Sequence, residues 1–343
     1  MTRVIKLDPI NFSDRDLDEA SEVLREGRLV SFPTETVYGL GAIASECKAV
    51  EKIYLAKGRP KDNPLIVHIS KIEEAYEYAL VNEEIESILT KIWPGPITLV
   101  LPSKGKLCKD VQGGLDSIAI RLPAHPIAIK LIEKTGTPIA APSANKSGKP
   151  SPTKASHVLE DLDGKVDLII DAGETFFGVE STVVKPEAGE VVILRPGPFT
   201  PEEIEKVFNM KVRIPPFSRG FGEAEVSLAP GTRYRHYAPK KPLLVLEDKK
   251  LLNELIIKLN SINLKPEILN FGEDLYSIAK NLFDVLRGLD KSVGDVGIAL
   301  GVEEKGIGLA IMNRLRKASG GLIIRDENDM DEVVERLRRL FIS

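Results

Sequence analysis

Short apolar runs alternate with longer amphipathic stretches along most of this 343-residue chain. Apolar runs of four or five residues fit buried strands, and stretches with apolar residues three or four positions apart fit helices that cover a sheet. This alternation is typical of an α/β fold. Because a single core rarely grows beyond roughly 250–300 residues, the length predicts two domains.

One stretch breaks the alternation and divides the chain. Residues 215–241 are rich in proline and glycine and have few periodic apolar positions, which predicts an extended linker. We therefore expect one domain over 1–214, the linker over 215–241 and a smaller domain over 242–343. The linker also contains Arg233, Tyr234, Arg235, His236 and Tyr237, and long loops with such content often cover binding sites.

The first domain is expected to hold a twisted mixed sheet with helices. Its predicted strands are 29–32, 65–69, 97–101, 118–122, 138–141, 168–171, 181–184 and 191–194, and its predicted helices are 14–26, 47–57, 83–92, 126–135 and 153–161. The second domain is expected to be a Rossmann-like parallel sheet wrapped by helices. Its predicted strands are 243–246, 267–270, 296–300 and 322–325, and its predicted helices are 249–260, 275–289, 309–318 and 330–341.

Composition excludes several classes of protein. With 47 basic and 51 acidic residues the net charge is −4, which argues against nucleic-acid binding by bulk charge but leaves a local basic cleft open. The sequence has no GxxxxGK[ST], GxSxG or HExxH motif, and its four histidines lack the spacing of metal ligands. Three glycines near 301–308 lack the order of a phosphate loop and fit a turn better.

The two cysteines and the lengths of the apolar runs indicate the cellular compartment of the protein. Cys47 and Cys108 form no CxxC pair, so we expect two free thiols, which suit a reducing cytoplasm. The first residues lack the apolar run of a signal peptide, and no stretch reaches the roughly 18 apolar residues of a membrane span. We expect a cytoplasmic protein that makes no membrane contact.

Four loops that follow strands or helices carry polar groups suited to anions. Residues 31–41 place Thr34 and Thr36 after a strand, where hydroxyls either cap a turn or bind a ligand. Residues 57–64 hold three cations within five residues and two prolines that stiffen the segment, which is either a phosphate site or a solvated helix end. His68 follows at the end of a strand, where a core histidine bonded to the backbone is the common alternative.

The other two loops follow later strands. Arg121 lies on the pattern of a buried strand, where a guanidinium needs an anion: either a structural carboxylate or the carboxylate of a substrate. Residues 140–153 pass from small apolar residues into serine, asparagine and lysine, groups that bind phosphate and ribose. Ligands collect where such loops meet at the edge of an α/β sheet, so the residues alone predict an anion-binding domain.

Together these segments resemble the YrdC-domain family. The matching runs are SFPTETVYGLG (31–41), Lys57-Gly58-Arg59-Pro60, Ser143-Ala144-Asn145, FGVESTV (177–183), Arg195-Pro196-Gly197 and PGTRYRHYAP (230–239). They occur in order and span nearly the whole chain, the last as in the longer, two-domain members. The resemblance implies a YrdC-like first domain that makes threonylcarbamoyl-AMP and pyrophosphate from L-threonine, bicarbonate and ATP, for threonylcarbamoyladenosine beside the anticodon of tRNA.

The resemblance also implies the site. L-threonine would contact Thr36, His68, Arg121, Ala141 and Ser181, with Arg121 on its carboxylate. ATP would contact Lys57, Arg59, Asn63, Ser117, Ser143, Asn145, Ser151, Arg195 and Tyr234. Lys57, Arg59 and Arg195 would act in catalysis by screening the reacting anions.

The same resemblance implies the other components of the reaction. Mg²⁺ would come with ATP, and no metal held by the protein is expected. The partner would be the machinery that transfers the threonylcarbamoyl group to tRNA, and a weak tRNA contact stays open. The alternative function is a module that binds tRNA or double-stranded RNA without catalysis. A carbamoyl-adenylate step in hydrogenase maturation is a second enzymatic alternative, but the chain lacks the zinc-finger and acylphosphatase-like segments that accompany it.

Overall fold

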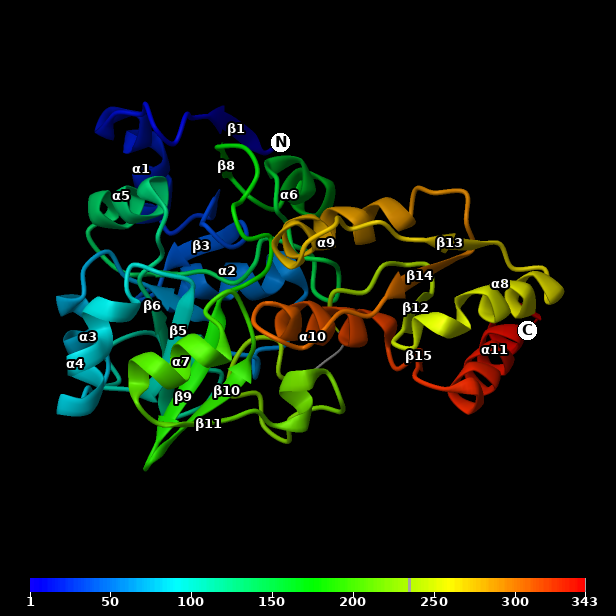
Figure 1. The fold of residues 1–343 in the computed structure, drawn as a ribbon. Helices are drawn as coiled ribbons and strands as arrows, with labels where there is room; N and C mark the ends of the chain where they lie inside the picture. The colour runs from blue at the N-terminus through cyan, green and yellow to red at the C-terminus, as the bar shows by residue number, and fades with distance from the viewer. Residues whose placement is uncertain (234–235, 343) are drawn as a thin grey trace.

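The computed structural model describes residues 1–233 and 236–342. These residues form a large sheet with its helices, a connecting segment and a small sheet with its own helices (Figure 1). The strands are β1 (Arg3–Lys6), β2 (Val30–Phe32), β3 (Gly39–Ile43), β4 (Ile66–His68), β5 (Ile97–Pro102), β6 (Ser117–Arg121), β7 (Ile139–Ala140), β8 (Leu168–Asp171), β9 (Thr182–Glu187), β10 (Glu190–Arg195), β11 (Lys211–Arg213), β12 (Leu243–Leu246), β13 (Pro266–Ile268), β14 (Val296–Leu300) and β15 (Ile323–Ile324).

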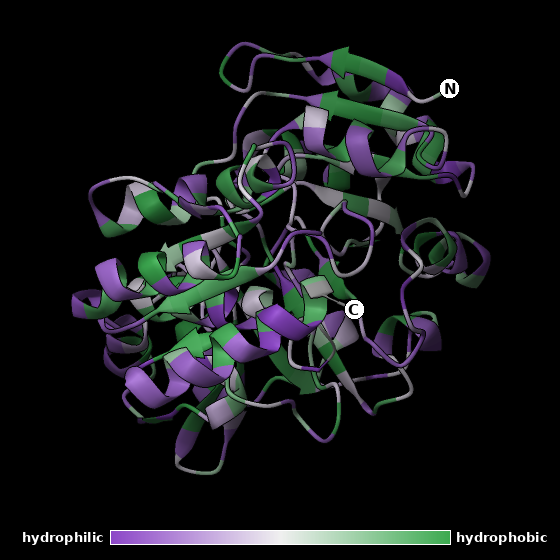
Figure 2. Ribbon diagram, turned by 90° about the vertical axis from the view of Figure 1, so that its right-hand side faces the viewer, coloured by the Kyte–Doolittle hydropathy of each residue, from purple (hydrophilic) through white to green (hydrophobic). Residues whose placement is uncertain are grey.

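The helices lie on the faces of the two sheets. The α-helices are α1 (Asp18–Arg25), α2 (Cys47–Lys57), α3 (Glu73–Tyr78), α4 (Glu83–Ile92), α5 (Pro126–Thr135), α6 (Ala155–Leu162), α7 (Pro201–Phe208), α8 (Leu252–Ser261), α9 (Leu275–Leu289), α10 (Gly308–Ser319) and α11 (Glu327–Ile342). Short 3₁₀ helices are η1 (Asp14–Leu17), η2 (Lys109–Gln112), η3 (Pro216–Arg219) and η4 (Lys249–Leu251). Figure 2 shows hydrophobic strands inside and helices with one hydrophilic side, as burial of an apolar stripe requires.

The large sheet is mixed, as the sequence predicts. Its order is β1-β8-β2-β3-β7-β4-β6-β5-β9-β10-β11. β4 and β6 run parallel with His68 opposite Arg121, while β7 runs antiparallel to β4. This register sets the ends of β4 and β6 side by side, and it places the end of β7 beside Ile66, at the start of the three-residue strand β4.

The small sheet is parallel, with the order β13-β14-β12-β15. Successive residues of a strand point to opposite faces. In β12, Leu243 and Val245 pack with α9 and α10, while Leu244 and Leu246 pack with α8 and α11. Both faces of this strand are covered, which explains why its four residues are all apolar.

Local signals explain where several helices begin and end. The side chain of Asn82 accepts a hydrogen bond from the Ile85 amide at 2.9 Å and caps α4. Gly58 takes a left-handed conformation at φ +63° and ends α2. The predictions for 47–57, 83–92, 126–135, 243–246, 275–289 and 296–300 match the observed bounds.

Among the described residues, five strands and α-helices lie outside the predicted ranges: β1, β3, β11, α3 and α7. β3 was missed because its sequence, GLGAI, reads as a turn. A Cβ atom on Gly41 would lie 2.8 Å from side-chain atoms of Phe32 and Ile139, so the strand needs glycine to fit between its neighbours. Segment 215–241 contains η3 and is otherwise without helix or strand where described, and Ala229 and Thr232 are fully buried in it.

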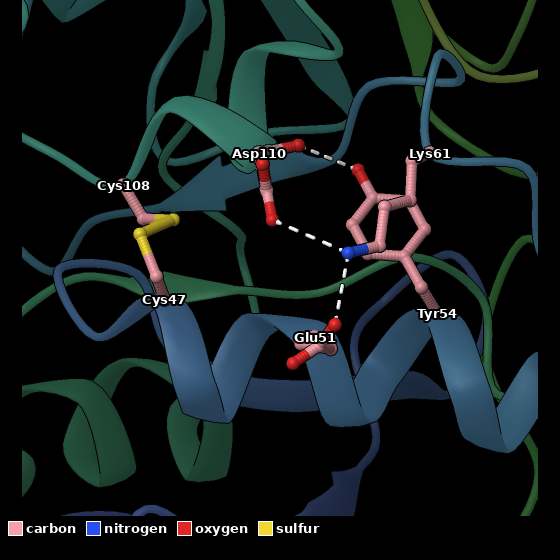
Figure 3. Close-up of a disulfide and its surroundings, with 6 residues drawn as sticks. All are labelled: Cys47, Glu51, Tyr54, Lys61, Cys108 and Asp110. Carbon is pink, nitrogen blue, oxygen red and sulfur yellow. Dashed lines mark hydrogen bonds and ion pairs between the residues drawn. A yellow bond between two sulfur atoms is a disulfide. The ribbon is translucent and has the colours of Figure 1, made fainter.

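The expectation of two free thiols was wrong. Cys47, at the start of α2, forms a disulfide with Cys108, beside η2, with a Cα–Cα distance of 5.2 Å (Figure 3). Further along the same pair of segments, the hydroxyl of Tyr54 donates to the carbonyl oxygen of Asp110 at 2.6 Å. The 61-residue separation gave no sequence signal of pairing, and the argument from free thiols to a reducing cytoplasm therefore fails. None of the described helices has the length and apolar character to cross a membrane.

Candidate active site

A buried cavity lies where the polar loops of the large sheet meet the linker. The lining comes from the loop after β2, the end of α2, β4 and β6, the loop after β7, the segment just before β9, the end of β10 and the linker. Of the predicted site residues, the cavity is lined by Thr36, Lys57, Arg59, His68, Arg121, Ala141, Ser143, Asn145, Ser151, Ser181 and Arg195. Loops separated by more than 150 residues thus share one site.

Three predicted residues stand apart from this set. Asn63 and Ser117 are absent from the cavity lining. Asn63 accepts a hydrogen bond from Ser227 of the linker at 3.3 Å, and Ser117 begins β6 whereas Arg121 ends it, about 13 Å away along an extended strand. Tyr234 lies outside the described residues. The role of all three in ATP binding stays a prediction.

Arg121 is buried at the end of β6. It pairs with a structural carboxylate and also faces the cavity, so both alternatives that the sequence left open apply to it. Its Nη2 pairs with Glu35 Oε1 at 2.5 Å, and its Nη1 donates to Thr36 Oγ1 at 3.1 Å. Its Nε donates to the Gly95 carbonyl oxygen at 3.2 Å. A guanidinium has five N–H groups, so each terminal nitrogen keeps one that no bond within the described residues uses. Because Arg121 lines the cavity and Glu35 does not, these two N–H groups suit a carboxylate in the cavity.

His68 is both a backbone-bonded core histidine and a cavity residue. Its Nδ1 lies 3.1 Å from the carbonyl oxygen of Ile66. Burial, and then the nearby charge of Arg121, lower the pKa of His68 from 6.5 to about 3. The ring is therefore neutral at physiological pH, and its role is to bond and fill space rather than to carry charge.

The lowered pKa of His68 predicts a loss of stability in acid. The unfolded chain binds a proton on this ring below pH 6.5, and the folded protein does so only near pH 3, so the free energy of unfolding falls as the pH drops through this window. The expected loss from His68 is about 2 kcal/mol between pH 6.5 and pH 5. Urea denaturation at several pH values tests it: His68→Gln should flatten the slope, and identical slopes would contradict the prediction.

The cations at the end of α2 and β10 hold the loops around the cavity. Lys57 is buried and its ammonium donates to the carbonyl oxygens of Ser143 and Asn145, the latter at 2.6 Å. Burial, followed by the charge of Arg59, moves the pKa of Lys57 well below its ordinary value. Arg195 donates to the carbonyl oxygens of Ser181, at 3.0 Å, and of Pro230 in the linker, at 3.2 Å. The carboxylate of Glu180 also lines the cavity, so an anion bound there would add to the negative charge that faces these cations.

The loop after β7 offers an unpaired polar atom. Asn145 donates its side-chain amide to the carbonyl oxygens of Lys146 and Lys149, at 2.9 and 3.1 Å. Its Oδ1 is buried and has no hydrogen-bond partner within the described part of the chain. Since buried polar atoms are normally satisfied, this oxygen indicates a position for a ligand donor.

Several lining residues were absent from the predicted set, including Glu180, Gly231, His236 and Tyr237. Glu180 lies within the run FGVESTV, and its charge in an apolar run was a usable signal. His236 and Tyr237 lie in the linker run 230–239, but the sequence does not indicate which side chains of this run point into the cavity. Tyr237 does so with a positive φ of 64°, and a Cβ atom on Gly231 would lie 2.9 Å from its hydroxyl.

Family models match both halves of the chain. The model for the Sua5, YciO and YrdC domain, described as telomere recombination, matches residues 22–197, and the model for the threonylcarbamoyl-AMP synthase C-terminal domain matches residues 199–320. A curated relative from Pyrococcus abyssi, named threonylcarbamoyl-AMP synthase, is 50% identical over 89% of this chain and 94% of its own length. A relative of the same name from Bacillus subtilis is 43% identical over 93% of this chain and 97% of its own length.

Solved structures agree with these matches. The crystal structure of P. abyssi Sua5 complexed with L-threonine has a TM-score of 0.89 and 47% identity, covering 94% of this chain and 99% of that chain. E. coli YciO, at 23% identity and a TM-score of 0.52 over 57% of this chain and 95% of that chain, shares the fold of the first domain. This chain belongs to the Sua5, YciO and YrdC family, in the two-domain form that carries the C-terminal domain of threonylcarbamoyl-AMP synthases.

Proposed function

We propose that this protein makes threonylcarbamoyl-AMP and pyrophosphate from L-threonine, bicarbonate or CO₂, and ATP, for threonylcarbamoyladenosine modification of tRNA. The observation that supports it best is one buried cavity beside the cations Lys57, Arg59 and Arg195. In it, Arg121 keeps two N–H groups that no bond to a described residue uses. The names of the relatives and the threonine complex of the P. abyssi protein support the same substrate.

The reaction follows from this arrangement. The amine of L-threonine attacks CO₂, forms the carbamate and loses a proton. A carbamate oxygen then attacks the α-phosphorus of ATP, and pyrophosphate leaves with the electrons of the broken P–O bond. Both partners are anions, so the cations must hold them in line against their repulsion.

Residues of this chain would divide the two substrates between them. Arg121, with Thr36, His68, Ala141 and Ser181, would hold L-threonine. Lys57, Arg59 and Arg195, with Ser143, Asn145 and Ser151, would hold ATP, and Asn63, Ser117 and Tyr234 are further ATP contacts that the family resemblance implies. We take Mg²⁺ to arrive on the phosphates, since it prefers oxygen ligands and keeps several waters. The described residues contain no group of three or more His, Cys, Asp or Glu side chains placed to hold a metal.

Incubation of the purified protein with ATP, Mg²⁺, bicarbonate and L-threonine tests the function. We expect pyrophosphate release and a threonylcarbamoyl-AMP product by mass spectrometry, both requiring L-threonine and bicarbonate. Omission of L-threonine is the control for simple ATP hydrolysis. Folded protein that binds tRNA in a salt-sensitive way, binds ATP and forms no product would instead favour the RNA-binding module. Transfer to tRNA is expected only after the downstream transferase is added.

A further inference from the structure

The C-terminal domain packs directly against a segment that lines the cavity. Gly178, in the run FGVESTV, has φ +75°, and a Cβ atom there would lie 2.4 Å from the Lys280 carbonyl oxygen of α9. The neighbouring Val179 and the linker residue Tyr237 belong to the same buried cluster as Phe283 of α9. Figure 1 places α10 between the two sheets. The segment that carries Glu180 and Ser181 is therefore packed from behind by the second domain.

Arg314 of α10 reaches through this contact. Its side chain is fully buried, and its Nε donates to Glu180 Oε2 at 3.0 Å. Its Nη2 donates to the Glu180 carbonyl oxygen at 3.3 Å, and its Nη1 donates to the Pro196 carbonyl oxygen at 2.6 Å. Ser181 and Arg195, the neighbours of the two residues it contacts, both line the cavity. One guanidinium thus joins two segments of the site.

The other carboxylate oxygen of Glu180 faces Ser151, which donates its hydroxyl proton to Glu180 Oε1. Burial alone would raise the pKa of Glu180, but the guanidinium groups of Arg314 and Arg195 and the Ser151 hydrogen bond hold it below the usual value. An ionised carboxylate can only accept hydrogen bonds, and a serine hydroxyl has a single proton. With that proton engaged, Ser151 Oγ offers only lone pairs to the cavity.

We infer that Arg314 is a positioning residue of the ATP site. It fixes Glu180 as an acceptor of the hydrogen bond from Ser151. Ser151 Oγ can then only accept a hydrogen bond from the ligand, and it selects a donor group of the nucleoside. The donors of ATP are its ribose hydroxyls and its adenine amine, whereas the phosphate oxygens have no proton to give near neutral pH. Ser151 therefore contacts the nucleoside and the phosphates lie toward the cations. The inference rests on the proposed function in taking ATP as the ligand and Ser151 as one of its contacts.

Equilibrium binding of ATP, 2′-deoxy-ATP, 3′-deoxy-ATP and ITP to the full chain tests the inference without requiring turnover. The first two analogues each lack one ribose hydroxyl, and ITP lacks the adenine amine. We expect the protein to bind ATP more tightly than one of the three by roughly fivefold to tenfold, the range for one hydrogen bond. The analogue that loses affinity identifies the donor. Equal binding of all four nucleotides within twofold would overturn the inference.

Variants distinguish the direction of the Ser151 hydrogen bond from a general loss of structure. Glu180→Gln keeps the size of the side chain, and its carbonyl oxygen can still face Arg314 while its amide donates to Ser151. Ser151 is then free to donate into the cavity, so the preference for ATP over the critical analogue should fall to within twofold, as it should in Ser151→Ala. Arg314→Met should also lose the preference for ATP. Arg314→Lys keeps the positive charge but not the several N–H groups of the guanidinium, so its preference should be intermediate.

Arg316→Met is the matched control. Arg316 lies on the same helix, is also buried, and pairs with Glu247 at 2.8 Å and Glu304 at 2.5 Å, neither of which lines the cavity. The preference of the Arg316→Met protein for ATP over the critical analogue should equal that of the unchanged protein. If folded Glu180→Gln, or both Arg314 variants, kept the full preference, the inference would be wrong. Normal selectivity without threonylcarbamoyl-AMP formation would instead reject only the proposed function.

Discussion

Replacement of Arg121 by alanine is expected to reduce threonine-dependent pyrophosphate formation about a thousandfold, because two charge-assisted hydrogen bonds to the substrate carboxylate are lost at ~2 kcal/mol each. The side chain ends β6 inside the cavity, and its unused N–H groups are the best candidates for that carboxylate. ATP binding, measured by calorimetry in the absence of L-threonine, should change little. Steady-state kinetics with varied L-threonine would check the loss.

The same change leaves Glu35 buried without its cation, so loss of structure must be separated from loss of a contact. Glu35 is 7% exposed, and an unpaired buried carboxylate is strongly destabilising. The double variant Arg121→Ala with Glu35→Gln removes that charge and should recover stability without recovering activity. Arg28→Ala, a surface arginine paired with Glu26 and Asp167, is the control and should remain fully active. Threonine turnover by a folded Arg121→Ala protein within tenfold of normal would contradict the assignment.

Loss of the disulfide is expected to lower the free energy of unfolding by about 2–4 kcal/mol. The bond joins residues 61 apart, so it removes much of the freedom of the unfolded chain between Cys47 and Cys108. The segment that it closes contains Lys57, Arg59 and His68. Urea denaturation of Cys47→Ser with Cys108→Ser should show the loss, and reductant should give the unchanged protein the same midpoint as the variant.

Lys61→Ala provides a control for general disturbance of this region. Lys61 pairs with Glu51, which lies in the helix that begins at Cys47, at 2.9 Å (Figure 3), and both side chains are about half exposed. Exposed ion pairs contribute about 0–1 kcal/mol, so this variant should remain close to the unchanged protein. A stability of the double serine variant equal to that of Lys61→Ala would show that the cross-link contributes little.

The sequence by itself determined the order of the elements and the segments that form the site. Periodicity located α2, α4, α5 and α9 because each is amphipathic over ten or more residues, and all-apolar runs located β12 and β14. Short or atypical elements escaped it: three of the five residues of β3 are glycine or alanine, and α3 has only six residues. The site segments were recognisable because polar groups that follow buried strands stand out against their surroundings.

The tertiary structure decided which of these groups meet, because contacts between distant residues have no signature in local spacing. It paired Cys47 with Cys108, placed Glu35 behind Arg121, and left Asn63 and Ser117 outside the cavity. It also brought Arg314 from the second domain onto Glu180, across 134 positions of the sequence. The sequence contains each of these side chains, but their effect depends on burial and on the neighbouring partner, and the tertiary packing within and between the domains sets both.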